Sequence, residues 1–364
     1  MEIELHMLKQ IKNQPYPIFI GDFFTEMDTF IYEMQPKVSK IYILVDENTH
    51  LNCIPSLIRN SSLLNNSEII EIESGEDQKN LEICFHLWQT LAENNTDRNA
   101  LLLNLGGGVI SDMGGFIAAT YKRGIRFINI PTTLLAMIDA AVGGKTGIDL
   151  GILKNHIGCF SNPNAVFINP QFLETLNDQD LKSGYGELLK YSLIHSKDLW
   201  NQFNTVSFNQ QSDWSSFIES SLAIKTEIVA QDPKEGGLRK VLNFGHTYGH
   251  AFESLSLSLK PNAHLLHGEA VALGIICELW HSVEKTNFPK KLFFEIKDFV
   301  FENFRVFPID ESHFDELIDL MKKDKKNADQ KIAVVLLEDI GQAHFDSFIN
   351  EEEIRDCLTY FIAQ

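Results

Sequence analysis

Short apolar runs separated by amphipathic stretches make up the first half of the chain. Three runs have strand length: residues 40–46 and 99–105 are apolar, and the second run, residues 67–73, alternates between apolar and polar residues. After the second run, apolar residues recur at helical spacing, at Phe85, Leu87, Trp88 and Leu91. Another helix is expected to begin near Ser111. Strands that alternate with helices predict a doubly wound α/β domain with a parallel sheet.

The pattern changes after about residue 177. Three long stretches, 181–196, 214–230 and 268–284, have helical periodicity, and β-branched runs are few. We therefore predict an α/β domain over residues 1–177 and a mostly α-helical domain over residues 178–364. The length of 364 residues supports two domains, because single hydrophobic cores rarely grow so large.

Composition and charge limit the classes of partner. The 44% of hydrophobic and 22% of charged residues are typical of a folded, soluble protein. A net charge of -19 opposes binding to nucleic acid or to anionic membranes, and no apolar run is long enough to span a bilayer. The first residues lack the features of a signal peptide, so we expect a cytoplasmic location. The five cysteines are scattered, which predicts neither disulfides nor a thiolate metal site.

A glycine-rich segment, residues 106–115, directly follows the third predicted strand. Glycines at a strand-to-helix turn let backbone amides approach a pyrophosphate, and the N-terminus of the helix adds positive potential. The generic dinucleotide motif is incomplete, because Ser111 occupies the position of its third glycine. Alone, the segment is consistent with a nucleotide site or with a tight packing turn.

A second candidate site consists of two histidine clusters, residues 243–253 with His246 and His250 and residues 267–269 with His267, and an upstream carboxylate, Glu187. Two imidazoles and a carboxylate from different segments would leave one coordination position open, as catalytic zinc sites do. His-x-x-x-His is a loose pattern, however, and ordinary polar residues are the alternative.

An anionic substrate would need local cations in so acidic a chain. Basic residues do occur in or near the glycine-rich and histidine-bearing segments: Arg123, Lys145, Lys154, Lys190, Lys225 and Arg239.

Further motifs closely resemble the 3-dehydroquinate synthase family, in the same order and at similar spacing. They are residues 119–125, 131–139, 142–147, 153–158, 186–190 and 235–239, together with both histidine clusters. The resemblance extends from about Asp46 to Lys326. It implies a Rossmann-like first domain that binds NAD+ and a second, helical domain that binds metal and substrate.

The resemblance also implies a reaction. Enzymes of this family convert 3-deoxy-D-arabino-heptulosonate 7-phosphate to 3-dehydroquinate and phosphate, a step of the shikimate pathway to aromatic amino acids. They use NAD+ and a divalent metal, usually zinc, for which cobalt can substitute. The C5 alcohol is transiently oxidised, phosphate is eliminated, the ketone is reduced, and an intramolecular aldol reaction closes the ring. We expect a homodimer that acts on this anionic sugar phosphate.

Site residues follow from the same resemblance. The metal ligands are Glu187, His246 and His267, and His250 relays the proton of the reacting hydroxyl. The phosphate is held by Arg123, Lys145, Asn155 and Lys325 or Lys326. The carboxylate and ring hydroxyls are contacted by Lys154, Lys225 and Arg239, and the hydroxyls and ligands are oriented by Asp139, Lys190 and Asn243. The NAD+ contacts are Asp46, Asn48, Glu76, Lys79, Gly107, Gly108, Val109, Asp112, Thr132, Thr133, Phe172 and Thr175, with Lys145 and Lys154. An acidic group after a strand commonly binds ribose hydroxyls, so Asp46 favours NAD over NADP.

The chain departs from the family pattern at a few positions. Gly186 replaces the more usual alanine, and Ser192 stands where glycine is common. The connection between the histidine clusters is a few residues longer than usual and contains His264, which makes His264 an alternative third ligand.

Three rival functions remain open at this point: a sister sugar-phosphate cyclase with another substrate, an NAD-dependent metal alcohol dehydrogenase, and a binding protein that kept the fold. The chain retains the residues expected for the substrate that carries a carboxylate, the heptulosonate phosphate. They are Lys225, Arg239, Asn243 and His250. Residues 142–145, which serve phosphate chemistry in the family, argue against a dehydrogenase.

Overall fold

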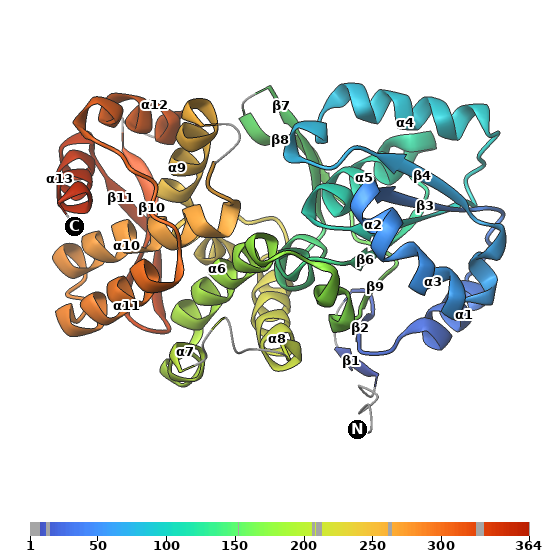
Figure 1. Cartoon of the computed structure of the whole chain (residues 1–364), viewed down its shortest axis with the longest axis horizontal. Helices are drawn as coiled ribbons and strands as arrows, with labels where there is room; N and C mark the ends of the chain where they lie inside the picture. Colours follow the sequence, from blue (N-terminus) through green and yellow to red (C-terminus); the bar gives the residue numbers. More distant parts are fainter. Residues whose placement is uncertain are drawn as a thin grey trace. The chain divides into compact units, whose positions relative to one another are not determined.

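The computed structural model describes residues 8–11, 15–151, 153–205, 208, 213–260, 264–324 and 331–363 (Figure 1). The chain forms two compact units. One comprises Met1–Asn177 with Asp213–Thr226, and the other comprises Asp178–Ser212 with Glu227–Gln364. Helix α8 (Ser215–Gln231) therefore begins in the first unit and ends in the second. The functions assigned to the two domains from the sequence remain predictions.

A seven-stranded sheet forms the centre of the first unit, in the order β1-β2-β9-β6-β5-β3-β4. Its strands are β1 (Lys9–Ile11), β2 (Ile18–Ile20), β3 (Ile41–Asp46), β4 (Glu68–Ile72), β5 (Leu101–Gly106), β6 (Arg126–Pro131) and β9 (Ala165–Ile168). All neighbouring strands are parallel except β1 and β2. The three strands predicted from the sequence are β3, β4 and β5, and the parallel sheet confirms the predicted fold class.

Helices connect the strands and cover both faces of the sheet. They are α1 (Phe24–Glu33), α2 (Glu47–Asn52), α3 (Ile54–Asn60), α4 (Leu81–Glu93) and α5 (Gly108–Thr120), with the short helices η1 (Ser62–Asn66), η2 (Glu76–Gln78), η3 (Tyr121–Arg123), η4 (Ala136–Ala140) and η5 (Pro170–Thr175). Leu44 of β3 and Leu102 of β5 belong to one core cluster with residues of α4 and α5. The alternate residues Ile43 and Leu103 are also fully buried, which explains why these strands read as continuous apolar runs.

The strand order places a topological switch point between β3 and β5. From β3 the chain continues to β4 at one edge, whereas from β5 it continues to β6 on the other side. Doubly wound sheets bind ligands at such a point, outside the carboxyl ends of the strands. Asp46 ends β3 and Gly106 ends β5, so the predicted ribose residue and the glycine-rich turn lie at the same edge.

A separate antiparallel hairpin of β7 (Lys145–Leu150) and β8 (Leu153–Phe160) packs beside α5. The second unit is mostly helical, as predicted. Its helices are α6 (Asp178–His195), α7 (Lys197–Asn204), α9 (His246–Leu259), α10 (His267–Lys285), α11 (Lys290–Asn303), α12 (Phe314–Asp324) and α13 (Glu351–Ile362), with the short helices η7 (Leu238–Asn243) and η9 (Glu311–His313). Helices α6, α8 and α10 are the three predicted from periodicity.

Helix α10 is the centre of the second unit. It is buried on all sides from Gly268 to Leu279 and packs against α6, α9, α11 and the antiparallel hairpin of β10 (Ile332–Asp339) and β11 (Gln342–Ile349). The sequence reading did not predict this hairpin, which turns at Gly341 with a left-handed φ of 83°. No helix among the described residues is long and apolar enough to cross a membrane.

Candidate active site and metal centre

Three helices of the second unit bring the predicted metal ligands together. Glu187 lies in the middle of α6, His246 is the first residue of α9, and His267 is the first residue of α10. Glu187 Oε1 lies 3.4 Å from His246 Nε2 and 3.5 Å from His267 Nε2. One carboxylate oxygen and two imidazole nitrogens therefore converge, a donor set that suits zinc or cobalt.

Glycines allow α6 and α10 to approach closely enough for this convergence. A Cβ added to Gly186 would lie 2.1 Å from Gly268 O, and one added to Gly268 would lie 1.7 Å from Ser183 O. Ser183 Oγ also accepts the backbone N–H of Gly268 at 3.1 Å, which ties the start of α10 to α6. The glycine at position 186, where alanine is more usual in the family, is thus a packing requirement of this chain.

Hydrogen bonds to Nδ1 orient both imidazoles. His246 Nδ1 lies 3.1 Å from Phe244 O, a group that can only accept, so Nδ1 carries the proton and Nε2 presents its lone pair. His267 Nδ1 lies 3.3 Å from Glu253 Oε2. A carboxylate behind a ligating histidine fixes its ring and raises its basicity.

Electrostatics favour a cation at this position. Burial lowers the pKa of His246 well below its usual value, which keeps that imidazole neutral. Burial also opposes the charged form of His267, but hydrogen bonds with Glu187 and Glu253 dominate and raise its pKa to about 10. Lys190 forms an ion pair with Glu187 in which both side chains are buried.

His250 lies within the same group. Its ring centroid is 5.3 Å from that of His246 and 5.7 Å from that of His267. One nitrogen of each of these three histidines lies within 4.8 Å of the others, so geometry also allows a three-histidine ligand set. Among the described residues, His264 does not belong to this group.

A carboxylate organises the loop that carries Arg239. Asp232 accepts backbone N–H groups from Gly236 at 2.9 Å, Gly237 at 2.7 Å and Arg239 at 3.0 Å. These hydrogen bonds, the one from Gly237 first, lower the pKa of Asp232. The Arg239 side chain is 2% exposed and donates to Pro233 O at 2.8 Å, while Asn243 Nδ2 donates to Glu235 Oε1 at 3.1 Å.

In the glycine-rich turn of the first unit, some glycines are needed for packing, whereas one leaves space beside the start of α5. Added Cβ atoms on Gly106 and Gly114 would lie 2.5 Å from Ile110 Cγ1 and 2.0 Å from Asn104 Oδ1, so these glycines serve packing. On Gly108, an added Cβ would meet only Ala140 Cβ at 3.5 Å, an ordinary contact. Packing does not require that glycine, which suits close approach of a phosphate to the N-terminus of α5.

Other predicted NAD+ contacts lie around this edge. Asp46 caps α2, with Oδ1 accepting Thr49 N at 2.7 Å, and Asn48 is exposed on the same helix. Thr132 Oγ1 is buried and has no hydrogen-bond partner within the described part of the chain, as expected of a group that awaits a ligand. Thr133 Oγ1 accepts Ala136 N at 3.1 Å. Phe172 and Thr175 lie in η5, where Thr175 Oγ1 donates to Phe172 O at 2.7 Å.

Lys79 joins the predicted nucleotide residues to the β7–β8 hairpin. Its Nζ donates to Asp112 Oδ2 at 2.6 Å and to Asn155 Oδ1 at 2.5 Å. Burial opposes its charge, but Asp112 and Glu76 outweigh burial and raise the pKa of Lys79. Lys154 Nζ lies 3.6 Å from Glu76 Oε1. Five predicted contacts, Glu76, Lys79, Asp112, Lys154 and Asn155, are therefore neighbours here, and Asn155 is held at a left-handed φ of 54°.

The remaining predicted cations are spread over the structure. Lys145 pairs with Phe160 at the open end of the hairpin, away from Asn155 near its turn. Lys225 Nζ forms an ion pair with Asp139 Oδ1 at 2.6 Å. Arg123 is exposed just before β6, at the amino end of the strands, and so lies at the opposite edge from the glycine-rich turn. Lys325 and its alternative Lys326 lie outside the described residues.

The sequence reading missed Glu253 and Asp232. Glu253 lies seven residues after His246, a spacing that places both on one face of a helix, so the pattern held a signal for it. Asp232 accepts backbone N–H groups only because of the conformation of its loop, and the sequence contains no signal for that conformation.

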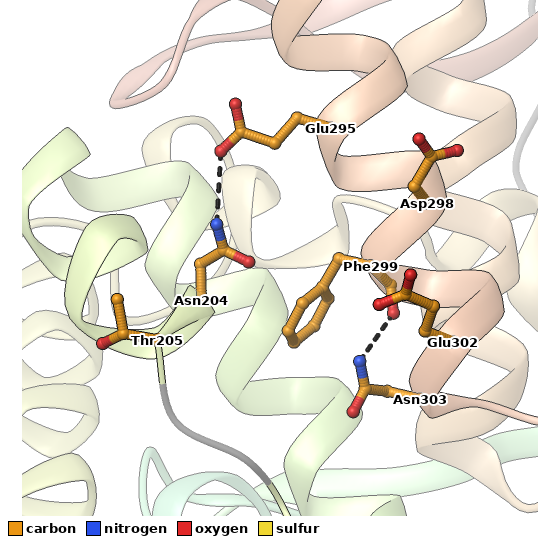
Figure 2. Close-up of a pocket in the computed structure, with 7 residues that line it drawn as sticks. All are labelled: Asn204, Thr205, Glu295, Asp298, Phe299, Glu302 and Asn303. Atoms are coloured by element: carbon orange, nitrogen blue, oxygen red, sulfur yellow. Dashed lines mark hydrogen bonds between the residues drawn. The ribbon is translucent and has the colours of Figure 1, made fainter.

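A pocket elsewhere in the second unit does not suit the predicted substrate. The pocket has a volume of about 430 Å³ and lies between α7 and α11 (Figure 2). Its lining is Asn204, Thr205, Glu295, Asp298, Phe299, Glu302 and Asn303, which includes three carboxylates and none of the predicted site residues. Such a lining repels an anionic sugar phosphate.

Comparison with known proteins identifies relatives along most of the chain. Residues 69–183 match the family model described as 3-dehydroquinate synthase N-terminal, and residues 184–327 match 3-dehydroquinate synthase C-terminal. The 3-dehydroquinate synthase of Parabacteroides distasonis is 41% identical over 94% of this chain and 97% of its own length.

Two solved structures share the fold. A 2-deoxy-scyllo-inosose synthase complexed with carbaglucose-6-phosphate, NAD+ and Co2+ has a TM-score of 0.81 at 21% identity, over 97% of this chain and 99% of its own. The 2-epi-5-epi-valiolone synthase of Streptomyces hygroscopicus, with NAD+ and Zn2+ bound, has a TM-score of 0.81 at 22% identity, over 98% of this chain and 99% of its own.

Proposed function

Because the chain belongs to the 3-dehydroquinate synthase family, we propose that it converts 3-deoxy-D-arabino-heptulosonate 7-phosphate to 3-dehydroquinate and phosphate. The observation that carries this proposal is the meeting of Glu187, His246 and His267 within a match to the family over nearly the full length. Identity to a 3-dehydroquinate synthase is 41%, against 21% and 22% for the two sister cyclases, which supports the carboxylate-bearing substrate.

Glu187, His246 and His267 would hold a zinc or cobalt ion, and residues around the glycine-rich turn, from Gly107 to Asp112, would hold NAD+. The structural neighbours, which carry NAD+ with Co2+ or Zn2+, support the choice of these two cofactors. When bound, NAD+ supplies a reversible hydride acceptor for C5, and the metal lowers the cost of deprotonating the C5 hydroxyl.

Residues around the proposed metal ligands would transfer the proton, position a ligand and bind the substrate carboxylate. His250, whose ring lies beside those of His246 and His267, would take and return the proton of the reacting hydroxyl. Lys190, paired with Glu187, holds that carboxylate in place. Arg239 offers the planar fork of donors that binds a carboxylate in two places, and Asp232 fixes the backbone that presents it.

In the first unit, Asn155 would bind the phosphate near the turn of the hairpin, with Lys145 as a further cation, and Lys154 would contact the carboxylate and ring hydroxyls. The ion pair of Asp139 with Lys225 supports a joint role in orienting substrate hydroxyls. Within the described part of the first unit, Arg123 does not lie near the hairpin turn that carries Asn155. Its predicted role in binding phosphate therefore rests on the resemblance alone.

A phosphate-release assay tests the proposal. Purified protein with NAD+ and Zn2+ or Co2+ should release phosphate from the heptulosonate phosphate without net NADH at 340 nm. Sedoheptulose 7-phosphate and glucose 6-phosphate serve as comparison substrates, and a preference for either one would assign a sister cyclase activity instead. Steady accumulation of NADH would support a dehydrogenase.

We further propose that the chain acts in the cytoplasm as a homodimer. Light scattering of the purified protein tests the dimer, because a mass equal to that of one chain would contradict it.

A further inference from the structure

Helix α9 begins at the proposed metal centre, and its own N-cap residue has no side chain to cap it. Its first residue is His246, and the preceding N-cap residue is Gly245, which adopts a left-handed φ of 80° and offers no side-chain acceptor. The first backbone N–H groups of a helix have no partner within the helix and need acceptors from elsewhere. In the dry interior of this unit, an unmet N–H would cost free energy.

Glu278 of α10 supplies these acceptors. Its Oε2 accepts Gly245 N at 2.9 Å, and its Oε1 accepts Thr247 N at 3.3 Å. The two amides flank His246. Glu278 is fully buried, and its negative charge is placed at the positive end of the α9 dipole.

Close helix packing keeps this carboxylate in reach. A Cβ added to Gly274, four residues before Glu278 on α10, would lie 2.0 Å from Gly245 O. The two helices are therefore in backbone contact at this point, and Glu278 bridges them there. It lies eleven residues after His267, or about three helical turns, so both side chains leave the same face of α10.

We propose that Glu278 is a positioning residue for the metal centre: it sets the placement of His246 relative to His267 by holding the start of α9 against α10. The inference rests on the proposed metal site. Through its two hydrogen bonds, Glu278 fixes the backbone on both sides of His246, and with it the turn at Phe244 whose carbonyl orients the imidazole. A residue that only capped α9 would contribute stability and leave the metal unaffected.

The test compares Glu278→Gln with wild type by titration of the metal-free protein with Co2+. The amide keeps the shape of the carboxylate but loses its charge and one acceptor. Disturbed support of a ligating histidine typically weakens metal affinity about 10–100-fold. We expect a loss in that range, together with a shift of the visible Co2+ absorption bands. Asn350→Ala, which removes the N-cap of α13 far along the chain, is the matched control and should leave affinity and spectrum unchanged.

Circular dichroism of the metal-free proteins shows whether the variants fold. If Glu278→Gln does not fold, Glu278→Asp decides, because it keeps the charge but is one methylene too short to hold both amides. Unchanged Co2+ affinity and spectrum in a folded variant, with a lower melting temperature like that of Asn350→Ala, would overturn the proposal. Failure of wild type to bind Co2+ would overturn both this inference and the proposed function. If wild type binds Co2+ and the Glu278→Gln variant binds it equally well, only this inference is overturned.

Discussion

Replacement of Gly186 by alanine tests whether the spacing of α6 and α10 sets the metal centre. The added Cβ would lie 2.1 Å from the carbonyl oxygen of Gly268, 2.5 Å from its carbon and 2.8 Å from its Cα. All three are backbone atoms, so no side chain can rotate away. Ordinary contacts begin at 3.4 Å, and the helices must therefore separate by about 1.3 Å.

Such a separation acts directly on the ligands. Glu187 follows Gly186 on α6, and His267 precedes Gly268 on α10, so the two proposed ligands move apart with their helices. Metal–ligand distances tolerate only about 0.2 Å. We expect Gly186→Ala to weaken metal affinity about 10–100-fold. We also expect it to lower the free energy of unfolding by about 1–3 kcal/mol, the usual cost of overpacking.

Chelator competition measures the metal affinity of the variant, and thermal unfolding of the metal-free protein measures its stability. Gly236→Ala is the matched control, because its added Cβ would meet only Asp232 Oδ1 at 3.9 Å. It should bind metal like wild type. A Gly186→Ala protein with wild-type affinity and stability would refute the reasoning, since the backbone approach could then not be what fixes the ligands.

Three further predictions concern Gly108, Arg239 and Asp232. Gly108→Ala should leave stability nearly unchanged but weaken NADH binding in a fluorescence titration about tenfold, or about 1.4 kcal/mol, because the Cβ occupies space that only a ligand needs. Arg239→Lys should raise the KM for the heptulosonate phosphate more than it lowers kcat, since lysine cannot make the two-point contact; an effect on kcat alone would contradict that role. Backbone N–H donors lower the folded pKa of Asp232, so its stabilising effect is present above about pH 4 and is lost as pH falls further. Denaturant unfolding should therefore show a deficit for Asp232→Asn at pH 6 that shrinks towards pH 3, and a deficit independent of pH would contradict the assignment.

Periodicity predicted several of the long elements but missed others, such as β10 and α11, as well as the short strands. Strands β3, β4 and β5 and helices α6, α8 and α10 lie where apolar spacing placed them. Strands β1, β2 and β9 have three or four residues each, too few for any period to be counted. The hairpin of β10 and β11 was missed because the apolar run of β10 lies next to helical stretches and resembles a short buried helix segment.

The candidate metal centre shows a different limit. Sequence spacing could propose His246, His250 and Glu187 because each belongs to a motif, but it could not separate ligand from proton relay, since positions 246 and 250 share one helix face. The structure adds the carboxylate on α6, the backbone contacts of Gly186 with Gly268 and the acceptors behind His246 and His267, but its geometry still allows His250 as a third ligand. None of these has a local pattern, because each depends on which helices pack together. Glu278 therefore becomes visible only in the structure, where it holds the start of α9, the helix that carries the proposed ligand His246.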